Sequence, residues 1–332
     1  MAHWREWEIN PVVVKELRQA VRSWAVTGTL LLFLVVLFCT AFGNLVSRFD
    51  TDIQAGGSVF RVFLIILSGA SLAFIPLYVG VRLASERQDS NLDLLYITTL
   101  TPGRIIRGKL FCGAYMAILF FSACMPFMAF TTLMRGVDLP TIFFILICLF
   151  LAVCLAVQGA IFLACLPVTR VLKILVAIFG VMWMFSAVVP IIFIFLQMVG
   201  SGVGSMMGSG QFWMRFFTTC ILALAGGLLF YFLSVAMISP ISANRALPVR
   251  SYITVSWILG GLFGVYEAIA KSSGLWTLTW SRISYFILCA SLVVIVSNHD
   301  ELSVRVRRAI PQNPAKRALA FLFFNGAAGG LV

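Results

Sequence analysis

Long apolar runs constrain this chain more than any other feature of its sequence. Each of eight runs is close to or above the roughly 20 residues that a helix needs to cross a bilayer. We therefore predict an all-α, polytopic membrane protein with about eight transmembrane helices. The predicted spans cover about 25–46, 59–83, 110–134, 141–166, 171–199, 212–238, 251–270 and 275–297.

Composition supports the same class. Hydrophobic residues make up 61% of the 332 residues and charged residues only 11%, whereas a soluble domain carries roughly 25% charged residues. The mean hydropathy is +1.03. A net charge of +12 is expected of cytoplasmic loops that touch anionic lipid. It does not predict a nucleic-acid partner, because no basic patch with interleaved aromatic residues appears.

The predicted transmembrane domain, residues 25–297, lies between two different ends. Residues 1–24 are expected to form a cytoplasmic N-terminus with an amphipathic helix, and residues 298–317 a basic cytoplasmic segment. The last apolar run, 318–332, is too short to cross a bilayer unaided. We expect it to be a partial ninth span cut short by the end of the sequence, or an interfacial or re-entrant tail.

The segment from Asn10 to Trp24 has the pattern of a basic amphipathic helix. Asn10 is a typical helix cap, and Pro11 suits the first helical position, where its missing N–H is harmless. The apolar residues and the cations each recur at spacings of three and four, which predicts a helix lying in the membrane interface. The segment either helps to receive a partner or serves only to hold the membrane. Its apolar residues are Val13, Val14, Leu17, Val21 and Trp24, and its cations are Lys15, Arg18 and Arg22.

The stretch 86–109 is the longest polar interruption between two predicted spans. Ser90 followed by Asp93 indicates a helix start, and three apolar residues then share one helical face. Thr101 and Pro102 indicate a second helix start. Either a partner protein or the lipid headgroups must cover the apolar face, which consists of Leu92, Leu95 and Tyr96.

Basic residues predict the orientation in the membrane, because cytoplasmic loops carry an excess of Lys and Arg. With a cytoplasmic N-terminus, 18 of the 24 Lys and Arg lie in the cytoplasm. The other six are Arg48, Arg61, Arg135, Arg215, Lys271 and Arg282. The predicted span count and this orientation therefore support each other.

Nothing in the sequence predicts a catalytic, cofactor or metal site. Residues 103–109 match the phosphate-loop spacing G-x-x-x-x-G-K, but Leu110 stands where a magnesium-binding Ser or Thr is needed. His3 and His299 are isolated, and the eight cysteines form no C-x-x-C motif, so they are predicted to be packing residues. The spacing of Gly260 and Gly264 indicates close packing within the chain.

The order and spacing of the segments in about the first 130 residues resemble those of the permease subunit of a type-2 ABC transporter. The resemblance rests on NPVVVKELRQAVRSW before the first span and on ERQDSNLDLLYITTLTPGRIIRGKL after the second. In that family an amphipathic elbow helix precedes the first span, and a coupling helix lies between the second and third. The family's usual six spans differ from the eight and a part predicted here.

The resemblance implies an ATP-driven transporter whose motor is a separate cytoplasmic ABC ATPase. This chain would be a plasma-membrane subunit without its own nucleotide site, frequently an exporter in this family, working with a second permease copy or a sister permease. The ATPase would dock on the coupling loop, residues 84–109, and on the elbow helix. The implied docking residues are Glu86, Arg87, Asp89, Leu92, Asp93, Leu95 and Tyr96, and the elbow residues are Asn10, Pro11, Lys15, Glu16, Arg18 and Arg22.

Two alternatives from other functional classes share the predicted topology. A secondary transporter would need polar groups and broken helices at the middle of the membrane. A non-transporting membrane scaffold would need neither these groups nor an ATPase partner. Association with an ATPase is the observation that separates both from the permease.

Overall fold

The described part of the chain consists of long apolar helices. The computed structural model describes residues 11–47, 55–88, 101–134, 137–166, 208–240 and 244–271, with single residues or short stretches in 178–199, 277–285 and 308–317. Six helices in these residues are long and apolar enough to cross a membrane. The chain is therefore an all-α, multi-pass membrane protein, as the sequence predicted.

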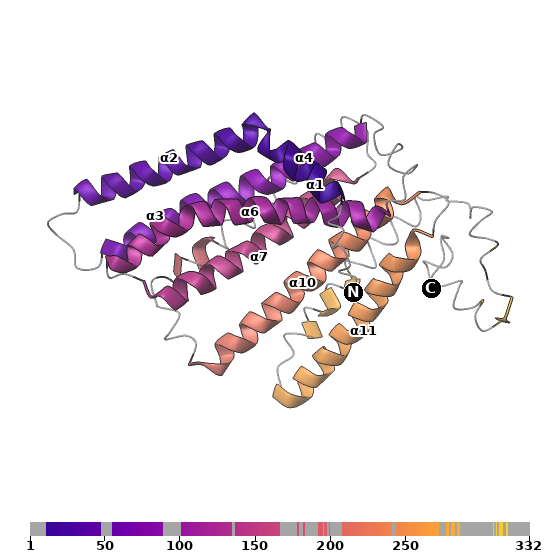
Figure 1. Cartoon of the computed structure of the whole chain (residues 1–332). Helices are drawn as coiled ribbons and strands as arrows, with labels where there is room; N and C mark the ends of the chain where they lie inside the picture. The colour runs from indigo at the N-terminus through magenta and orange to yellow at the C-terminus, as the bar shows by residue number, and fades with distance from the viewer. Residues whose placement is uncertain are drawn as a thin grey trace, which may run out of the picture. The chain divides into compact units, whose positions relative to one another are not determined.

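The described helices follow one another along the chain (Figure 1). In order they are α1 (Pro11–Val21), α2 (Trp24–Ser47), α3 (Ala55–Gly69), the π-helical segment η1 (Ala70–Phe74), α4 (Ile75–Gln88), α6 (Pro102–Leu133), α7 (Leu139–Ala164), α10 (Gly210–Ile238) and α11 (Ala246–Lys271).

The long helices coincide with the first, second, third, fourth, sixth and seventh predicted spans. The fifth and eighth predicted spans, 171–199 and 275–297, lie largely outside the described residues, as does the segment 298–317. The partial ninth span, 318–332, lies wholly outside them.

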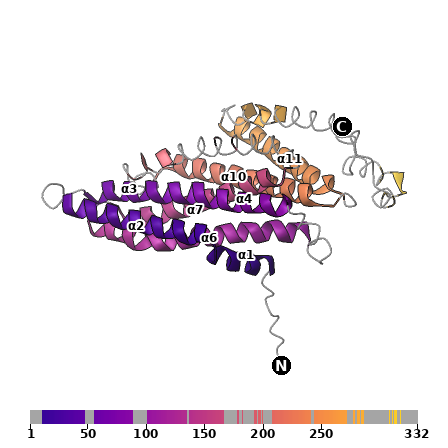
Figure 2. The ribbon, with the colours of Figure 1, turned by 90° about the horizontal axis from the view of Figure 1, so that it is seen from above.

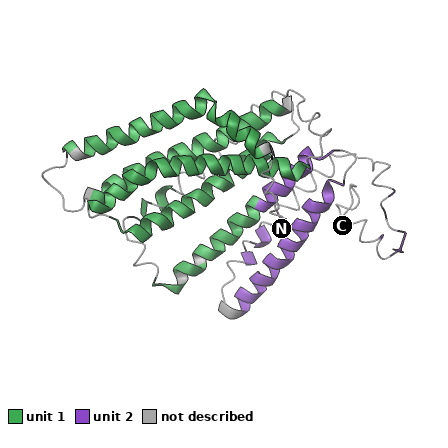
Figure 3. Cartoon of the chain, viewed as in Figure 1, with its two compact units in different colours: residues 1–227 green, residues 228–332 purple. Residues whose placement is uncertain are grey.

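The chain divides into two compact units, residues 1–227 and 228–332 (Figure 3). The boundary falls within α10. The first unit contains α1 to α7 and α10 up to Gly227, and the second contains the rest of α10 and α11.

A proline begins α6 where the sequence predicts it. Helix α6 begins at Pro102 after Thr101, whose extended backbone is that of a helix cap. Pro11 is the first described residue of α1, and the predicted cap Asn10 lies outside the described residues. The carbonyl of Thr101 accepts the first backbone hydrogen bonds of α6. Helices α4 and α6 extend into both ends of the segment 84–109, so that residues 89–100 are the part of it outside the described residues.

The second span is a continuous helix from Ala55 to Gln88 with a π-helical turn inside it. The turn, η1, ends two residues before Pro76. A proline inside a helix cannot donate to the carbonyl four residues earlier, and its ring crowds that carbonyl. A wider π-helical turn relieves this crowding, so Pro76 is the sequence signal for a feature that apolar length alone does not predict.

Helix α6 is the centre of the first unit, and it contacts α1, α2, α3, α4 and α7 (Figures 1 and 2). Phe120 of α6 packs against Phe33 of α2 and Phe74 of η1, with ring centroids 5.2 Å and 6.0 Å apart. All three rings are large and apolar, and Phe120 is fully buried. Burial of aromatic rings in such pairs stabilises the contact beyond area alone.

Two glycines allow α7 to approach its neighbours closely. A Cβ at Gly113 of α6 would lie 2.7 Å from Val157 Cγ1, and a Cβ at Gly80 of α4 would lie 3.3 Å from Ala160 Cβ. Small residues are common where helices pack in membranes, because association there depends on close van der Waals contact. Helix α7 is thereby packed tightly against both α4 and α6.

In the second unit, α11 packs against Trp280 through two glycines. A Cβ at Gly260 or Gly261 would lie 3.0 Å or 3.1 Å from the indole. Trp280 Nε1 donates to the carbonyl of Trp257 over 3.1 Å, and Trp257 Nε1 donates to Ser284 Oγ over 2.9 Å. The prediction that Gly260 serves packing within the chain is confirmed.

The contact at Gly113 predicts a stability difference between two glycine substitutions. We expect Gly113→Ala to destabilise the protein by about 1–3 kcal/mol, because the new methyl overlaps the stiff, buried side chain of Val157. Thermal unfolding of the purified chain in neutral detergent measures the effect as a lower melting temperature.

Gly28 of α2 is the matched control. No atom lies within 4 Å of a Cβ built there, and alanine is the better helix former by about 1 kcal/mol. Gly28→Ala should leave the melting temperature unchanged or raise it. Adding Val157→Ala to Gly113→Ala should remove part of the overlap, and equal melting temperatures for the Gly113 and Gly28 variants would contradict the assignment.

Candidate functional site

Lys109 is the centre of a buried ionic network that joins three helices. Its ammonium group donates hydrogen bonds to Glu16 Oε1 and to Glu86 Oε2, each over 2.6 Å. Lys109 lies on α6, Glu16 on α1 and Glu86 on α4. The side chains of Lys109 and Glu16 are each only 3% exposed, and that of Glu86 is 19% exposed.

Two further cations contribute to the network. Arg82 Nε lies 3.4 Å from Glu16 Oε2, and Lys15 Nζ lies 3.9 Å from Glu86 Oε1. Each carboxylate therefore faces Lys109 on one side and a second cation on the other. The network consists of two carboxylates and three cationic side chains. Among the described residues, no group of three or more His, Cys, Asp or Glu side chains could hold a metal ion.

Arg82 is itself held by neutral partners. Its Nη1 donates to the Tyr78 hydroxyl over 2.7 Å, and its Nη2 donates to the side-chain carbonyl of Gln19. Its guanidinium also lies 5.9 Å from the centre of the Tyr78 ring. Because Gln19 is on α1 and Tyr78 is on α4, Arg82 forms a second connection between these two helices.

The position of the network along α6 explains how charges can be tolerated there. A helix of 32 residues is about 48 Å long, whereas the hydrocarbon core is about 30 Å thick. Lys109 is the eighth residue of α6 and lies near one end. A buried charge still loses its hydration, and this loss is offset only when the group is paired and hydrogen-bonded. The two 2.6 Å bonds provide that pairing.

Helix α7 contributes a buried amide close to this end of the bundle. The residue before Gln158, Val157, packs against Gly113 of α6. Gly113 lies four residues, about one helical turn, after Lys109. Gln158 is 3% exposed, and neither its Nε2 nor its Oε1 has a hydrogen-bond partner in the structure. By contrast, buried Ser71 and Thr131 donate to carbonyls of their own helices.

The structure shows contacts within the chain for two of the residues that the sequence predicts as elbow or docking residues. Glu16 is a predicted elbow residue, and its carboxylate accepts a hydrogen bond from Lys109. Glu86 is a predicted docking residue, and its carboxylate also accepts a hydrogen bond from Lys109 within the chain. Lys15, Arg18 and Arg22 are exposed, on α1 or just after its last residue.

The remaining predicted site residues lie at the limits of the described chain. Pro11 begins α1 and Arg87 lies in α4, where only their backbones are described. Asn10, Asp89, Leu92, Asp93, Leu95 and Tyr96 lie outside the described residues.

Sequence reasoning gave no structural role to Lys109, Arg82 or Gln158. Residues 103–109, which match a phosphate-loop pattern, are helical in α6, and the lysine of that pattern is bonded to two carboxylates. A usable signal was present in the sequence: each of the three polar residues sits among apolar ones within or beside a predicted span.

No family model, no curated protein and no solved structure matches this chain. The function is therefore inferred from the chain's own residues and their arrangement.

Removal of the central cation should strongly destabilise the protein. We expect Lys109→Met to cost about 3–5 kcal/mol, because it leaves the buried Glu16 carboxylate and the partly buried Glu86 carboxylate without their shared partner. The melting temperature in detergent should fall by roughly 10 °C for a chain of this size. Adding Glu16→Gln to Lys109→Met should recover part of the loss.

Lys15 is the control for this substitution, since it also pairs with Glu86 but is 54% exposed. An exposed pair contributes about 0–1 kcal/mol, so Lys15→Met should change the melting temperature little. If Lys109→Met and Lys15→Met behave alike, the network is not what holds the three helices.

Replacement of Gln158, whose side-chain amide has no hydrogen-bond partner, should stabilise the protein rather than destabilise it. Gln158→Met has nearly the same volume and removes two buried polar atoms without partners, so we expect a stabilisation of about 1–3 kcal/mol and a higher melting temperature. Asn44 is the comparison, because its amide donates to the Thr40 carbonyl over 2.7 Å. Asn44→Leu should give no gain, and a lower melting temperature for Gln158→Met would show that the amide is satisfied.

Proposed function

We propose that this chain is the permease subunit of an ATP-driven transporter of the type-2 ABC class. It lies in the plasma membrane with its N-terminus in the cytoplasm, and it works as an exporter together with a second copy or a sister permease. ATP is hydrolysed by a separate cytoplasmic ATPase that docks on the segment between α4 and α6.

The ionic network is the observation that supports this proposal most. The segment 89–100 leaves the end of α4 and returns at the start of α6, and Lys109 connects both of these helices to α1. A force applied to the segment would therefore act on three helices together. The proposal is also supported by the polar character of the segment between α4 and α6.

In this proposal the predicted docking residues have different tasks. Glu86 holds the base of the segment in place, because its carboxylate is occupied by Lys109 and lies near Lys15. Arg87, Asp89 and Asp93 then make the polar contacts with the motor. Leu92, Leu95 and Tyr96 form the apolar face that enters its groove, a frequent way for an amphipathic helix to bind.

A test of the proposal must separate docking from stability. Charge reversal at Glu86 would disturb the network as well as any docking, so we choose Leu92→Asp combined with Leu95→Asp. The full chain, tagged and purified from its native membranes in mild detergent, should carry vanadate-sensitive ATP hydrolysis. The double variant should lose at least about tenfold of that activity, because charged residues at a buried contact are strongly unfavourable.

Arg61→Gln, an exposed substitution on α3, serves as the matched control and should retain the activity. Unchanged size-exclusion profiles would show that both variants are inserted and folded. Activity that survives in the double variant would contradict the docking assignment. A wild-type chain without any associated ATPase would contradict the proposed class, and transport driven by an ion gradient alone would favour a secondary transporter.

A further inference from the structure

Helix α1 presents three different faces, and one of them is already occupied. Glu16 and Ala20 are 2% and 3% exposed, and α1 contacts α6. Since these residues are four apart, they share one face of the helix. This inner face is fixed to the bundle by the network.

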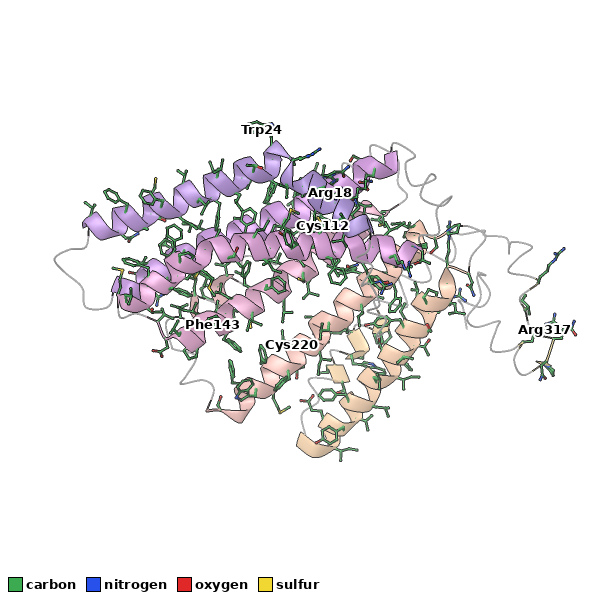
Figure 4. All side chains as sticks on the ribbon, in the orientation of Figure 1. Arg18, Trp24, Cys112, Phe143, Cys220 and Arg317 are labelled. Atoms are coloured by element: carbon green, nitrogen blue, oxygen red, sulfur yellow. The ribbon has the colours of Figure 1, made fainter. Side chains whose placement is uncertain are left out.

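A stripe of cations covers another face of α1. Lys15, Arg18 and Arg22 follow one another at spacings of three and four and are exposed, and Lys15 keeps 54% of its side-chain surface. The guanidinium groups of Arg18 and Arg22 form no ion pair or hydrogen bond with any other described residue. Arg18 is labelled on α1 in Figure 4.

An apolar stripe lies between the inner face and the cations. Leu17 and Val21 are four residues apart, and Val21 is 66% exposed. The stripe leads to Trp24 at the start of α2, which is 90% exposed and points away from the helices (Figure 4). It continues in exposed apolar residues of α2 such as Leu31 and Leu32. Because α2 is long and apolar enough to span the membrane, this continuous surface faces lipid.

We propose that the outer surface of α1 binds anionic phospholipids of the bilayer. The phosphate groups bind Arg18 and Arg22, whose planar guanidinium groups suit two-point contact with phosphate oxygens. The acyl chains lie along Leu17, Val21 and Trp24. An anionic lipid is the partner that matches both stripes, since it joins a negative headgroup to an apolar tail.

The inner face gives this binding a structural consequence. Glu16 and Lys15 connect α1 to the network, so lipid that holds α1 in place also stabilises the contacts of α1 with α4 and α6. A ligand that binds only the folded state raises its stability. The inference does not depend on the proposed function, because it requires no ATPase and no transported substrate.

The test measures thermal unfolding of the full chain in neutral detergent with a small amount of added lipid. Phosphatidylglycerol should raise the melting temperature by roughly 3 °C or more, and phosphatidylcholine with the same acyl chains should raise it much less. Added salt should weaken the difference, because it screens exposed charges.

Substitutions on the cationic stripe should remove the lipid effect. Arg18→Gln combined with Arg22→Gln should abolish the difference between the two lipids, whereas Arg18→Lys combined with Arg22→Lys should retain much of it. Arg61→Gln on α3 is the matched control and should respond like the wild type. All of these residues are exposed, so the melting temperature without lipid should change little.

Several outcomes would overturn the inference. Equal stabilisation by both lipids would show that only the acyl chains matter. Equal stabilisation by soluble glycerol phosphate would show a site for free phosphate rather than for lipid. A full lipid response in the Arg18→Gln/Arg22→Gln variant would place the binding surface elsewhere.

Discussion

The pairing of Lys109 with two carboxylates is the constraint on which the rest of the first unit depends. A charge removed from water must find opposite charge and hydrogen bonds nearby. Lys109, Glu16 and Glu86 belong to three different helices, so they can satisfy one another only if α1, α4 and α6 meet at the same end. The position of the N-terminal helix is thus set by electrostatics as well as by its apolar residues.

Other buried polar groups in the described helices meet the same requirement locally. Ser71, Thr131 and Ser234 donate to backbone carbonyls three or four residues earlier, which costs the helix little and needs no partner from elsewhere. Lys109 has too long a side chain and too strong a charge for that solution. The network is therefore where charged side chains of these helices depend on partners from other helices, and Gln158 is a buried amide that neither solution satisfies.

The sequence was sufficient for the features that depend on local chemistry. Apolar length located six spans that the structure describes, and Pro102 located the start of α6. It did not reveal the partner of a charge: Lys109 and Glu16 are 93 residues apart. The docking role of Glu86 follows from the family resemblance, and the sequence alone does not show that this residue has a partner within the chain. Only the fold shows that its carboxylate is turned inward.

These contacts also limit how the bundle can move. Gly113 and Gly80 bring α6 and α4 into close contact with α7, and packed interiors resist small separations because close contacts are lost at once. Within the network, Lys109 and Arg82 hold α1 against α6 and α4. Separation of α4 from α6 would break ion pairs and close packing together. The ion pairs and the close packing therefore favour movement of α1, α4, α6 and α7 as one body.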